Sequence, residues 1–376
     1  MESVRKLEVL CNDRKVGTLA PYQRYLTAFE YSSDWLRDGY PLSPFSLPLE
    51  PGVKIADFEP FEGLFGIFAD SMPDGWGRLL VDRMLRSRGE KPEELGVLER
   101  LSIVGESGMG ALEYRPVYEK GSTAAGHDLD QLAEECRKVL NSEASDLDLL
   151  YALGASSGGA RPKVLLEIEG EEWIVKFPAA EDPADIGLME YEYDLCAKEC
   201  GIEIPEVRLF PSKNGPGYFG CRRFDRTKED GVKKKIHMAT ASGLLEVSHR
   251  MPALDYTTLM ALTWQLCKRE EELEKMYRLM CFNVFAHNRD DHSNNISYLC
   301  RDGVWRLSPA YDLTYSWSFA GEHATTVDGE GKAPTAEDIL RVARKAGLRM
   351  SRAREIAEQI KETVNSRLAA YLEDRR

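Results

Sequence analysis

Hydrophobic and polar positions change their spacing along the chain, from strand-like alternation near the N-terminus to helical spacing near the C-terminus. The segment KLEVLCNDRKVGTLA predicts two short strands around the polar turn NDRK, and the Pro-rich stretch PLSPFSLPLEPG predicts an edge or loop. A helix is predicted over SMPDGWGRLLVDRMLRSRGE, ending near Gly89. Residues 1–120 are therefore expected to form a β-rich subdomain with helical insertions.

The pattern changes after the small, polar stretch KGSTAAGHDLD, which predicts a domain boundary. DLDQLAEECRKVLN predicts an amphipathic helix, and the Gly/Ser-rich loop GASSGG precedes two strands, VLLEIE and WIVKFP, that turn at Gly170. The helix MEYEYDLCAKECG is expected to close at Gly201, before the strands EVRLFPS and YFGCRRFDR. Residues 121–240 are thus predicted to form an α/β domain.

From about residue 241 to residue 376 the pattern is helical. Helices are predicted near 257–267 and 269–286, and a further one begins with a Thr335…Asp338 capping pattern. The last predicted helix carries one apolar stripe at four-residue steps, formed by Ile356, Ile360, Val364 and Leu368. The expected fold class is α+β, with an all-helical C-terminal lobe.

Charge and composition limit the classes of function. The chain has 376 residues with 49 Lys and Arg against 63 Asp and Glu, a net charge of −14, which argues against wrapping DNA with the whole surface. It has no apolar run of the ~18 residues that a membrane helix needs, and its N-terminus has no apolar signal core. The eight cysteines form no CxxC pair, which favours buried thiols in the cytoplasm.

The strongest chemical signal lies in FNVFAHNRDDHSNNISYL. Asp290 is followed five residues later by Asn295, the D-x-x-x-x-N spacing of a phosphotransferase catalytic loop. In such a loop the Asp deprotonates the attacking hydroxyl, and the Asn oxygen binds Mg²⁺ on the nucleotide phosphates. Asp312, in RLSPAYDLTYS, is in the place of a second metal-binding carboxylate.

Upstream residues supply the other parts of this scheme in the right order. Gly158 and Gly159 would let backbone amides approach phosphate. Lys176 would neutralise phosphate charge, and Glu190 would hold that lysine in place.

Other interpretations of the same segments remain open. HNRDDHSNN could be a solvated turn, Lys176 a surface residue, and Glu192 rather than Glu190 the partner of the lysine. His287, Asp290 and His292 could bind a metal, although their spacing does not place both histidines on one helix face.

GASSG satisfies the G-x-S-x-G motif of serine hydrolases. That motif needs a strand before the serine and a helix after it, whereas Pro162 and the strand-like VLLEIE follow here.

One basic cluster stands out on this acidic chain. RRFDRTKEDGVKKK (222–235) has seven basic against three acidic residues, a local charge of +4, with EDG at the place of a hairpin turn. It is either a solvated hairpin or an electropositive rim for an acidic or RNA-bearing substrate.

Taken together, the motifs resemble the HipA family of serine/threonine kinases, toxins of bacterial toxin–antitoxin modules. The resemblance lies in SSGGARPK, WIVKFP, ECGIEIPEV, RRFDR, DDHSNN and SPAYDL, and in KVGTLA, LSPFSLPLEPG, DSMPDGWG and GESGMGALEY near the N-terminus. It covers nearly the whole chain. It implies a kinase-like two-lobe fold with an extra β-rich N-terminal subdomain, and use of ATP and Mg²⁺.

The resemblance also implies roles for individual residues. It makes Asp290 the catalytic base, Asn295 and Asp312 the metal ligands, and Lys176 the ATP-phosphate lysine. His292 matches the histidine of the family's loop, and Phe224 lies in the hinge-like RFDR strand expected to border adenine. Ser156 matches the serine that the family autophosphorylates, with Ser157 beside it, and phosphorylation there should expel the loop and inactivate the kinase.

The family further implies a HipB-like helix-turn-helix antitoxin, through which DNA would be bound indirectly, and an aminoacyl-tRNA synthetase as substrate. This chain departs from the family at Asp291, where a glycine is common and an added negative charge is expected, and at Arg222, where some relatives carry an acidic residue. Two alternatives stay open: a small-molecule kinase, and a catalytically idle co-repressor subunit of an antitoxin–DNA complex.

Overall fold

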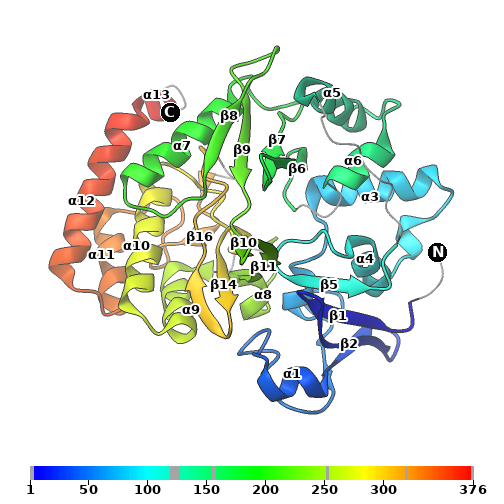
Figure 1. The fold of residues 1–376 in the computed structure, drawn as a ribbon. Coiled ribbons are helices and arrows are strands. Elements are labelled where there is room, and N and C mark those ends of the chain that lie inside the picture. The colour runs from blue at the N-terminus through cyan, green and yellow to red at the C-terminus, as the bar shows by residue number, and fades with distance from the viewer. Residues whose placement is uncertain (1–3, 119–127, 155–157, 251–253, 318–320, 374–376) are drawn as a thin grey trace. The chain divides into compact units, whose positions relative to one another are not determined.

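The computed structural model describes residues 4–118, 128–154, 158–250, 254–317 and 321–373. These fall into two compact units (Figure 1). Unit 1 comprises Met1–Leu188 and Val207–Met238, and unit 2 comprises Met189–Glu206 and Ala239–Arg376. Each unit is described by itself.

Unit 1 contains an antiparallel sheet at its N-terminal end. The strands are β1 (Leu7–Cys11), β2 (Arg14–Tyr22), β3 (Leu26–Tyr31), β4 (Lys54–Ile55) and β5 (Leu112–Arg115), in the order β4-β3-β2-β1-β5. Asn12 and Asp13 make the β1–β2 turn with positive φ angles of 48° and 62°, which these two residue types tolerate. The predicted NDRK turn is therefore confirmed. The accompanying helices are α1 (Ser33–Asp38), α2 (Gly66–Ala69), α3 (Gly75–Ser87), η1 (Pro92–Glu94) and α4 (Val97–Val104).

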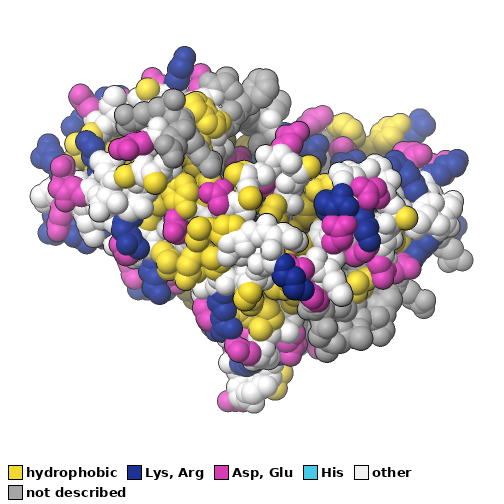
Figure 2. Space-filling model, turned by 90° about the horizontal axis from the view of Figure 1, so that it is seen from above, with side chains coloured by type: hydrophobic (Ala, Val, Ile, Leu, Met, Phe, Trp, Pro, Cys, Tyr) yellow, Lys and Arg dark blue, Asp and Glu magenta, His cyan; other side chains and the backbone are white. Residues whose placement is uncertain are grey.

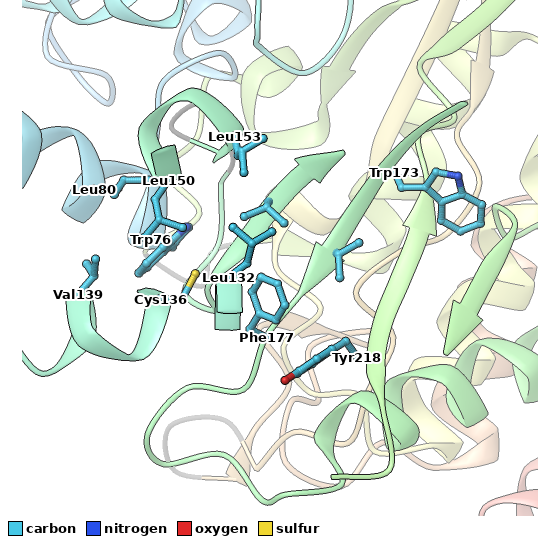
Figure 3. Close-up of a cluster of buried hydrophobic side chains, with 12 residues drawn as sticks. Trp76, Leu80, Leu132, Cys136, Val139, Leu150, Leu153, Trp173, Phe177 and Tyr218 are labelled. Atoms are coloured by element: carbon cyan, nitrogen blue, oxygen red, sulfur yellow. The ribbon is translucent and has the colours of Figure 1, made fainter. Parts of the chain in front are cut away.

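A second sheet in unit 1 carries the glycine-rich segment. Its strands β6 (Lys163–Ile168), β7 (Glu171–Lys176), β8 (Val207–Phe210) and β9 (Tyr218–Arg222) have the order β6-β7-β9-β8. Two helices, α5 (Leu129–Leu140) and α6 (Leu147–Gly154), precede it, and the hairpin of β10 (Arg226–Glu229) and β11 (Val232–Lys235) follows it. Figure 3 shows the core these elements share, in which Trp76 and Leu80 of α3 lie with side chains of α5, α6 and the sheet. Residues on both sides of the predicted boundary near 120 thus pack in one core.

Unit 2 is mainly helical. Its helices are α8 (Ala241–Leu245), α9 (Tyr256–Cys267), α10 (Glu270–Phe285), α11 (Ala336–Lys345), α12 (Met350–Arg367) and α13 (Ala369–Glu373), together with most of α7 (Ile186–Glu199). The hairpin of β14 (Ser297–Arg301) and β15 (Val304–Leu307), the parallel pair β13 (Leu254–Asp255) and β16 (Thr325–Thr326), and the short helix η2 (Ser293–Asn295) complete it. The helical character of the C-terminal lobe is confirmed, and short strands are added to it.

Two local predictions for the helices of unit 2 are confirmed. Thr335 and Asp338 form the predicted capping box at the start of α11. The predicted apolar stripe is buried: Ile356, Ile360 and Val364 of α12, and Leu368 at its C-cap, are each at most 1% exposed. Since they stand four residues apart, one helix face is buried and the other is solvated.

The surface carries charges of both signs. On the face shown in Figure 2, Lys and Arg side chains are interspersed with Asp and Glu side chains. All eight cysteines are buried and none forms a disulfide, as predicted. Within the described ranges, no helix combines the length and apolar character that crossing a membrane requires.

His237, at the start of β12 (His237–Thr240), is expected to make the stability of unit 1 depend on pH. Its side chain is 1% exposed, and its Nε2 donates to the carbonyl oxygen of Leu42 at 2.9 Å. Burial lowers the pKa of His237 from 6.5 to about 4, so between these values the unfolded chain binds a proton that the folded chain does not. Stability should therefore be complete above pH 6.5 and should fall toward pH 4, by about 3 kcal/mol. Urea unfolding at pH 7 and pH 4.5 should show a larger loss for the native chain than for His237→Gln, and equal losses would contradict the assignment.

Candidate active site

The candidate catalytic loop follows α10 in unit 2. After the helix cap at Ala286, His287 takes a positive φ of 53° and turns the chain out of the helical path. Asn288 then donates from its side chain to Asn283 Oδ1 of α10 at 2.9 Å, and it forms a parallel bridge with Ser316. The loop is thus tied to the helix and to the segment after Asp312 before it reaches Asp290.

Asp290 presents its carboxylate to solvent, with a side chain that is 61% exposed. Its backbone is held from the other end of the motif, because Asn295 Nδ2 donates to the Asp290 carbonyl oxygen at 2.8 Å. The five-residue spacing thus lets Asn295 hold the backbone of Asp290, and the same side chain retains an amide oxygen of the kind that binds Mg²⁺. The structure brings these two predicted residues together.

His292 lies beside Asp290 with a defined proton position. Its Nδ1 accepts from the backbone N–H of Asn294 at 3.3 Å, so in the neutral ring the proton lies on Nε2. This Nε2 faces Asp290 Oδ1 at 3.7 Å, and the ring of His249 lies 5.5 Å from that of His292. The structure thus places His292, the match to the family's loop histidine, next to the Asp290 carboxylate.

Asp291 carries its negative charge inside unit 2 and not on the exposed face of the loop. Its side chain is fully buried, and Oδ2 accepts from Tyr256 Oη at 2.9 Å and lies 3.0 Å from His323 Nδ1. Oδ1 accepts from the Thr325 backbone N–H at 3.1 Å. Burial, and then the Asp291 charge, raise the pKa of Tyr256 well above its usual range, so this hydroxyl stays a donor. Asp291 therefore anchors the loop from inside, while Asp290 points outward.

Asp312 follows the β14–β15 hairpin and has a left-handed backbone with φ 55°. Its neighbour Tyr311 donates to the Asn294 carbonyl oxygen at 2.6 Å, and Leu313 is buried. The Asp312 segment is thus bonded to the segment that carries Asn295. The two predicted metal ligands come from backbone segments that the structure holds together.

The glycine-rich segment belongs to unit 1. Ser156 and Ser157 lie outside the described residues, whereas Gly158 and Gly159 are exposed. The Gly159 carbonyl oxygen accepts from the Trp76 backbone N–H at 2.9 Å, and a Cβ on Gly75 would come within 2.4 Å of that oxygen. The start of α3 therefore positions this segment, and Gly75 is needed for the close approach.

Two lysines face each other next to these glycines. Lys176, the last residue of β7, is the register partner of Lys163, the first residue of β6. Lys163 is buried and its Nζ donates to the Gly158 carbonyl oxygen at 2.6 Å, while Lys176 Nζ lies 5.4 Å from the ring centroid of Phe219. Two cations beside an exposed glycine segment favour an anionic ligand. No motif in the sequence singles out Lys163.

Glu190 and Glu192 lie on α7, in unit 2. Glu190 is 2% exposed, whereas Glu192 accepts a hydrogen bond from Tyr371 Oη of α13. Glu192 thus has a partner within the helical unit, and the pairing of Glu190 or Glu192 with Lys176 stays a prediction.

The RRFDR segment is shorter as a strand than predicted, and two of its charges are buried. Strand β9 ends at Arg222, and Phe224 lies half-buried in a turn. Asp225 is fully buried and accepts from Arg223, Arg226 and the Gly110 backbone N–H at 2.6–2.9 Å. Burial alone would raise the pKa of Asp225, but the two guanidiniums and this N–H hold it at about 2. The network joins RRFDR to the segment GESGMG, so two motifs that carry the family resemblance are hydrogen-bonded to each other.

The basic cluster at 222–235 is largely neutralised. Arg223 and Arg226 are paired with Asp225, and three lysines of the cluster form ion pairs at 2.5–2.7 Å: Lys228 with Glu171, Lys233 with Glu167, and Lys235 with Glu113. Most of its formal charge is thus matched by neighbouring carboxylates. The interpretation as a charge-paired hairpin is favoured over an electropositive rim.

Two alternative chemistries do not fit the geometry. Among the described residues, no group of three or more His, Cys, Asp or Glu side chains could hold a metal, which argues against a site at His287, Asp290 and His292. In the GASSG segment, helix α6 precedes the serines and strand β6 follows them. A nucleophile elbow needs the opposite order.

Comparisons with known proteins agree with this arrangement. The sequence model of the HipA N-terminal domain family matches residues 7–115, and that of the HipA-like C-terminal domain family matches residues 155–368. Toxin YjjJ of Escherichia coli (strain K12) is 23% identical over 273 residues, which cover 67% of this chain and 60% of YjjJ. The matched region is thus less than two thirds of the length of that relative.

Solved structures show the fold. A chain of the Shewanella oneidensis MR-1 toxin–antitoxin complex of HipA, HipB and operator DNA superposes with a TM-score of 0.73 at 18% identity, covering 97% of this chain and 90% of that chain. The Helicobacter pylori proinflammatory kinase CtkA reaches a TM-score of only 0.38 at 13% identity, covering 57% of this chain and 89% of CtkA. The first similarity establishes a shared fold, whereas the second is too weak to bear on function. Because the C-terminal family model alone covers more than half of the 376 residues, the chain belongs to the HipA family.

Proposed function

We propose that this chain is an ATP- and Mg²⁺-dependent protein serine/threonine kinase. The observation that carries the proposal is the geometry of the catalytic loop. Asp290 exposes its carboxylate, Asn295 holds the backbone of Asp290, and the buried Asp291 fixes the loop from inside. Phosphoryl transfer depends mainly on such positioning of a base and of charged groups.

The residues present fit the two cofactors. Asn295 and Asp312 offer the amide and carboxylate oxygens that Mg²⁺ prefers. Two protein ligands are enough, because Mg²⁺ keeps several waters and also binds substrate phosphates. Bound Mg·ATP would supply the transferable phosphoryl group, with its charge reduced by the metal. Lys176 would face the phosphates, and Asp290 would take the proton of the attacking hydroxyl.

Membership of the HipA family supports further proposals about partners and regulation. The similarity to a HipA–HipB–operator complex supports a HipB-like antitoxin as partner, with DNA bound through it, since this chain has a net charge of −14. We propose an aminoacyl-tRNA synthetase as substrate and Ser156 as the autophosphorylation site. A phosphate there would add about −2 of charge beside the nucleotide phosphates and oppose ATP binding.

Calorimetric titration of the full chain with ATP tests this proposal. We expect binding in Mg²⁺, weaker binding in EDTA, and a roughly 10–100-fold loss of affinity for Lys176→Met, since a charge-assisted contact to phosphate is removed. Lys234→Met, on the exposed hairpin, should bind as the native chain does and serves as the matched control.

Absence of binding heat with Mg·ATP would contradict the proposal and favour a catalytically idle co-repressor. With binding established, labelled ATP should transfer its phosphate to proteins rather than to aminoglycosides or sugars. The reverse preference would identify a small-molecule kinase.

A further inference from the structure

The side chain of Arg289, the residue before Asp290, is a cation whose buried N–H groups lack acceptors. Its Nε and Nη1 atoms are buried, and within the described part of the chain neither has a hydrogen-bond partner. No ion pair joins Arg289 to a carboxylate of these residues within 4.0 Å. Buried guanidinium N–H groups are normally paired, so these two N–H groups of the half-buried Arg289 favour an anionic acceptor.

Trp317 gives this cation a platform that is open to solvent. The Arg289 guanidinium carbon lies 5.7 Å from the Trp317 ring centroid, and the Trp317 side chain is 55% exposed. Stacking on an indole satisfies the face of a guanidinium, but its N–H groups point outward in the plane and still need acceptors. Tyr315 supports the indole edge-on, with ring centroids 6.0 Å apart.

The backbone around this pair is well fixed. Asn288 bridges to Ser316, the Ser316 N–H donates to the His287 carbonyl oxygen at 3.1 Å, and the Ala324 N–H donates to the Arg289 carbonyl oxygen at 3.0 Å. The residues on either side of the Arg289–Trp317 contact are therefore held by main-chain hydrogen bonds. A site built this way can receive a ligand without reorganising its backbone.

We propose that Arg289 and Trp317 form a receptor for a phosphomonoester dianion. A guanidinium fork matches phosphate geometry, and a phosphorylated hydroxyl brings about two negative charges and three acceptor oxygens. This proposal rests on the proposed function in one respect: the kinase reaction would produce the phosphomonoester. Asp290, one residue away, is the proposed base of that reaction. The phosphate can be carried by a serine or threonine side chain or arrive as the free ion.

Thermal unfolding of the full chain without nucleotide or Mg²⁺ tests the site. Inorganic phosphate and O-phospho-L-serine should each raise the Tm with the logarithm of their concentration above Kd, by about 2 °C at ten times Kd, whereas acetate at equal ionic strength should not. Arg289→Met should abolish the rise and, without any anion, should melt above the native chain, because an unpaired buried charge is removed. Arg289→Lys, which keeps the charge but not the fork, should weaken binding about tenfold.

Arg354→Met, at an exposed position of α12, is the matched control and should respond to phosphate as the native chain does. A stronger response to phosphoserine than to phosphate supports an attached phosphate as ligand, and an equal response supports the free ion. An equal phosphate response in the native chain and in Arg289→Met would overturn the site, and an equal response to acetate would overturn the phosphate class. Since no ATP is present, failure of the kinase proposal cannot produce either result.

Discussion

Asp291→Ala should destabilise unit 2 by about 3–5 kcal/mol, the cost of removing one partner of a buried charged network. The Asp291 side chain is fully buried and holds Tyr256, His323 and the backbone N–H of Thr325. Alanine would leave three polar groups without an acceptor, in a place that water does not reach. Since Asp291 stands next to Asp290, the proposed base, the exposed carboxylate should also lose its fixed position, and the proposed phosphoryl transfer should fall with stability.

Urea unfolding of the purified chain measures this effect. Asp291→Asn should fall between the alanine variant and the native chain, because the amide oxygen can still accept from Tyr256 or Thr325 while the charge that faces His323 is lost. Asp302→Asn, in the exposed turn between β14 and β15, is the matched control, because asparagine tolerates the positive φ of 50° there, and it should stay within about 0.5 kcal/mol of the native chain. If Asp291→Ala were as stable as this control, Asp291 would not be an anchor.

Local patterns predicted the elements well because their causes are local. The capping residues Thr335 and Asp338 and the stripe on α12 depend on contacts within three or four residues. The D-x-x-x-x-N spacing also has a local cause, since Asn295 bonds the backbone of Asp290 within one loop. These features could be inferred from the sequence alone.

What the sequence did not reveal depends on contacts between distant segments. Asp291 is buried and Asp290 is exposed because Asp291 contacts Tyr256 and His323. These two residues lie more than 30 positions away, one on each side in the sequence. The Asp225 network depends on Gly110, 115 residues earlier. The glycine segment rests on Trp76, whose only sequence signal was the motif DGWG. Hydrophobic spacing carries no information about such pairs.

Asp290→Asn should lower the rate of phosphoryl transfer by roughly 10²–10⁴-fold, the usual contribution of a general base. Asparagine keeps the shape of the side chain and can still accept a hydrogen bond, but it cannot take the proton of the attacking hydroxyl. The side chain is 61% exposed, so the substitution should leave the free energy of unfolding nearly unchanged. Affinity for Mg·ATP should also be retained, because Lys176, Asn295 and Asp312 remain.

The most direct test is the initial rate at which purified chain transfers label from γ-labelled ATP to protein in the presence of Mg²⁺. Asp302→Asn makes the same chemical change at an exposed turn and controls for charge and handling. We predict that the native chain and Asp302→Asn label protein at equal rates, and that Asp290→Asn is at least about 100-fold slower with the same Tm. Transfer by Asp290→Asn at the native rate would contradict the assignment of Asp290 as the base.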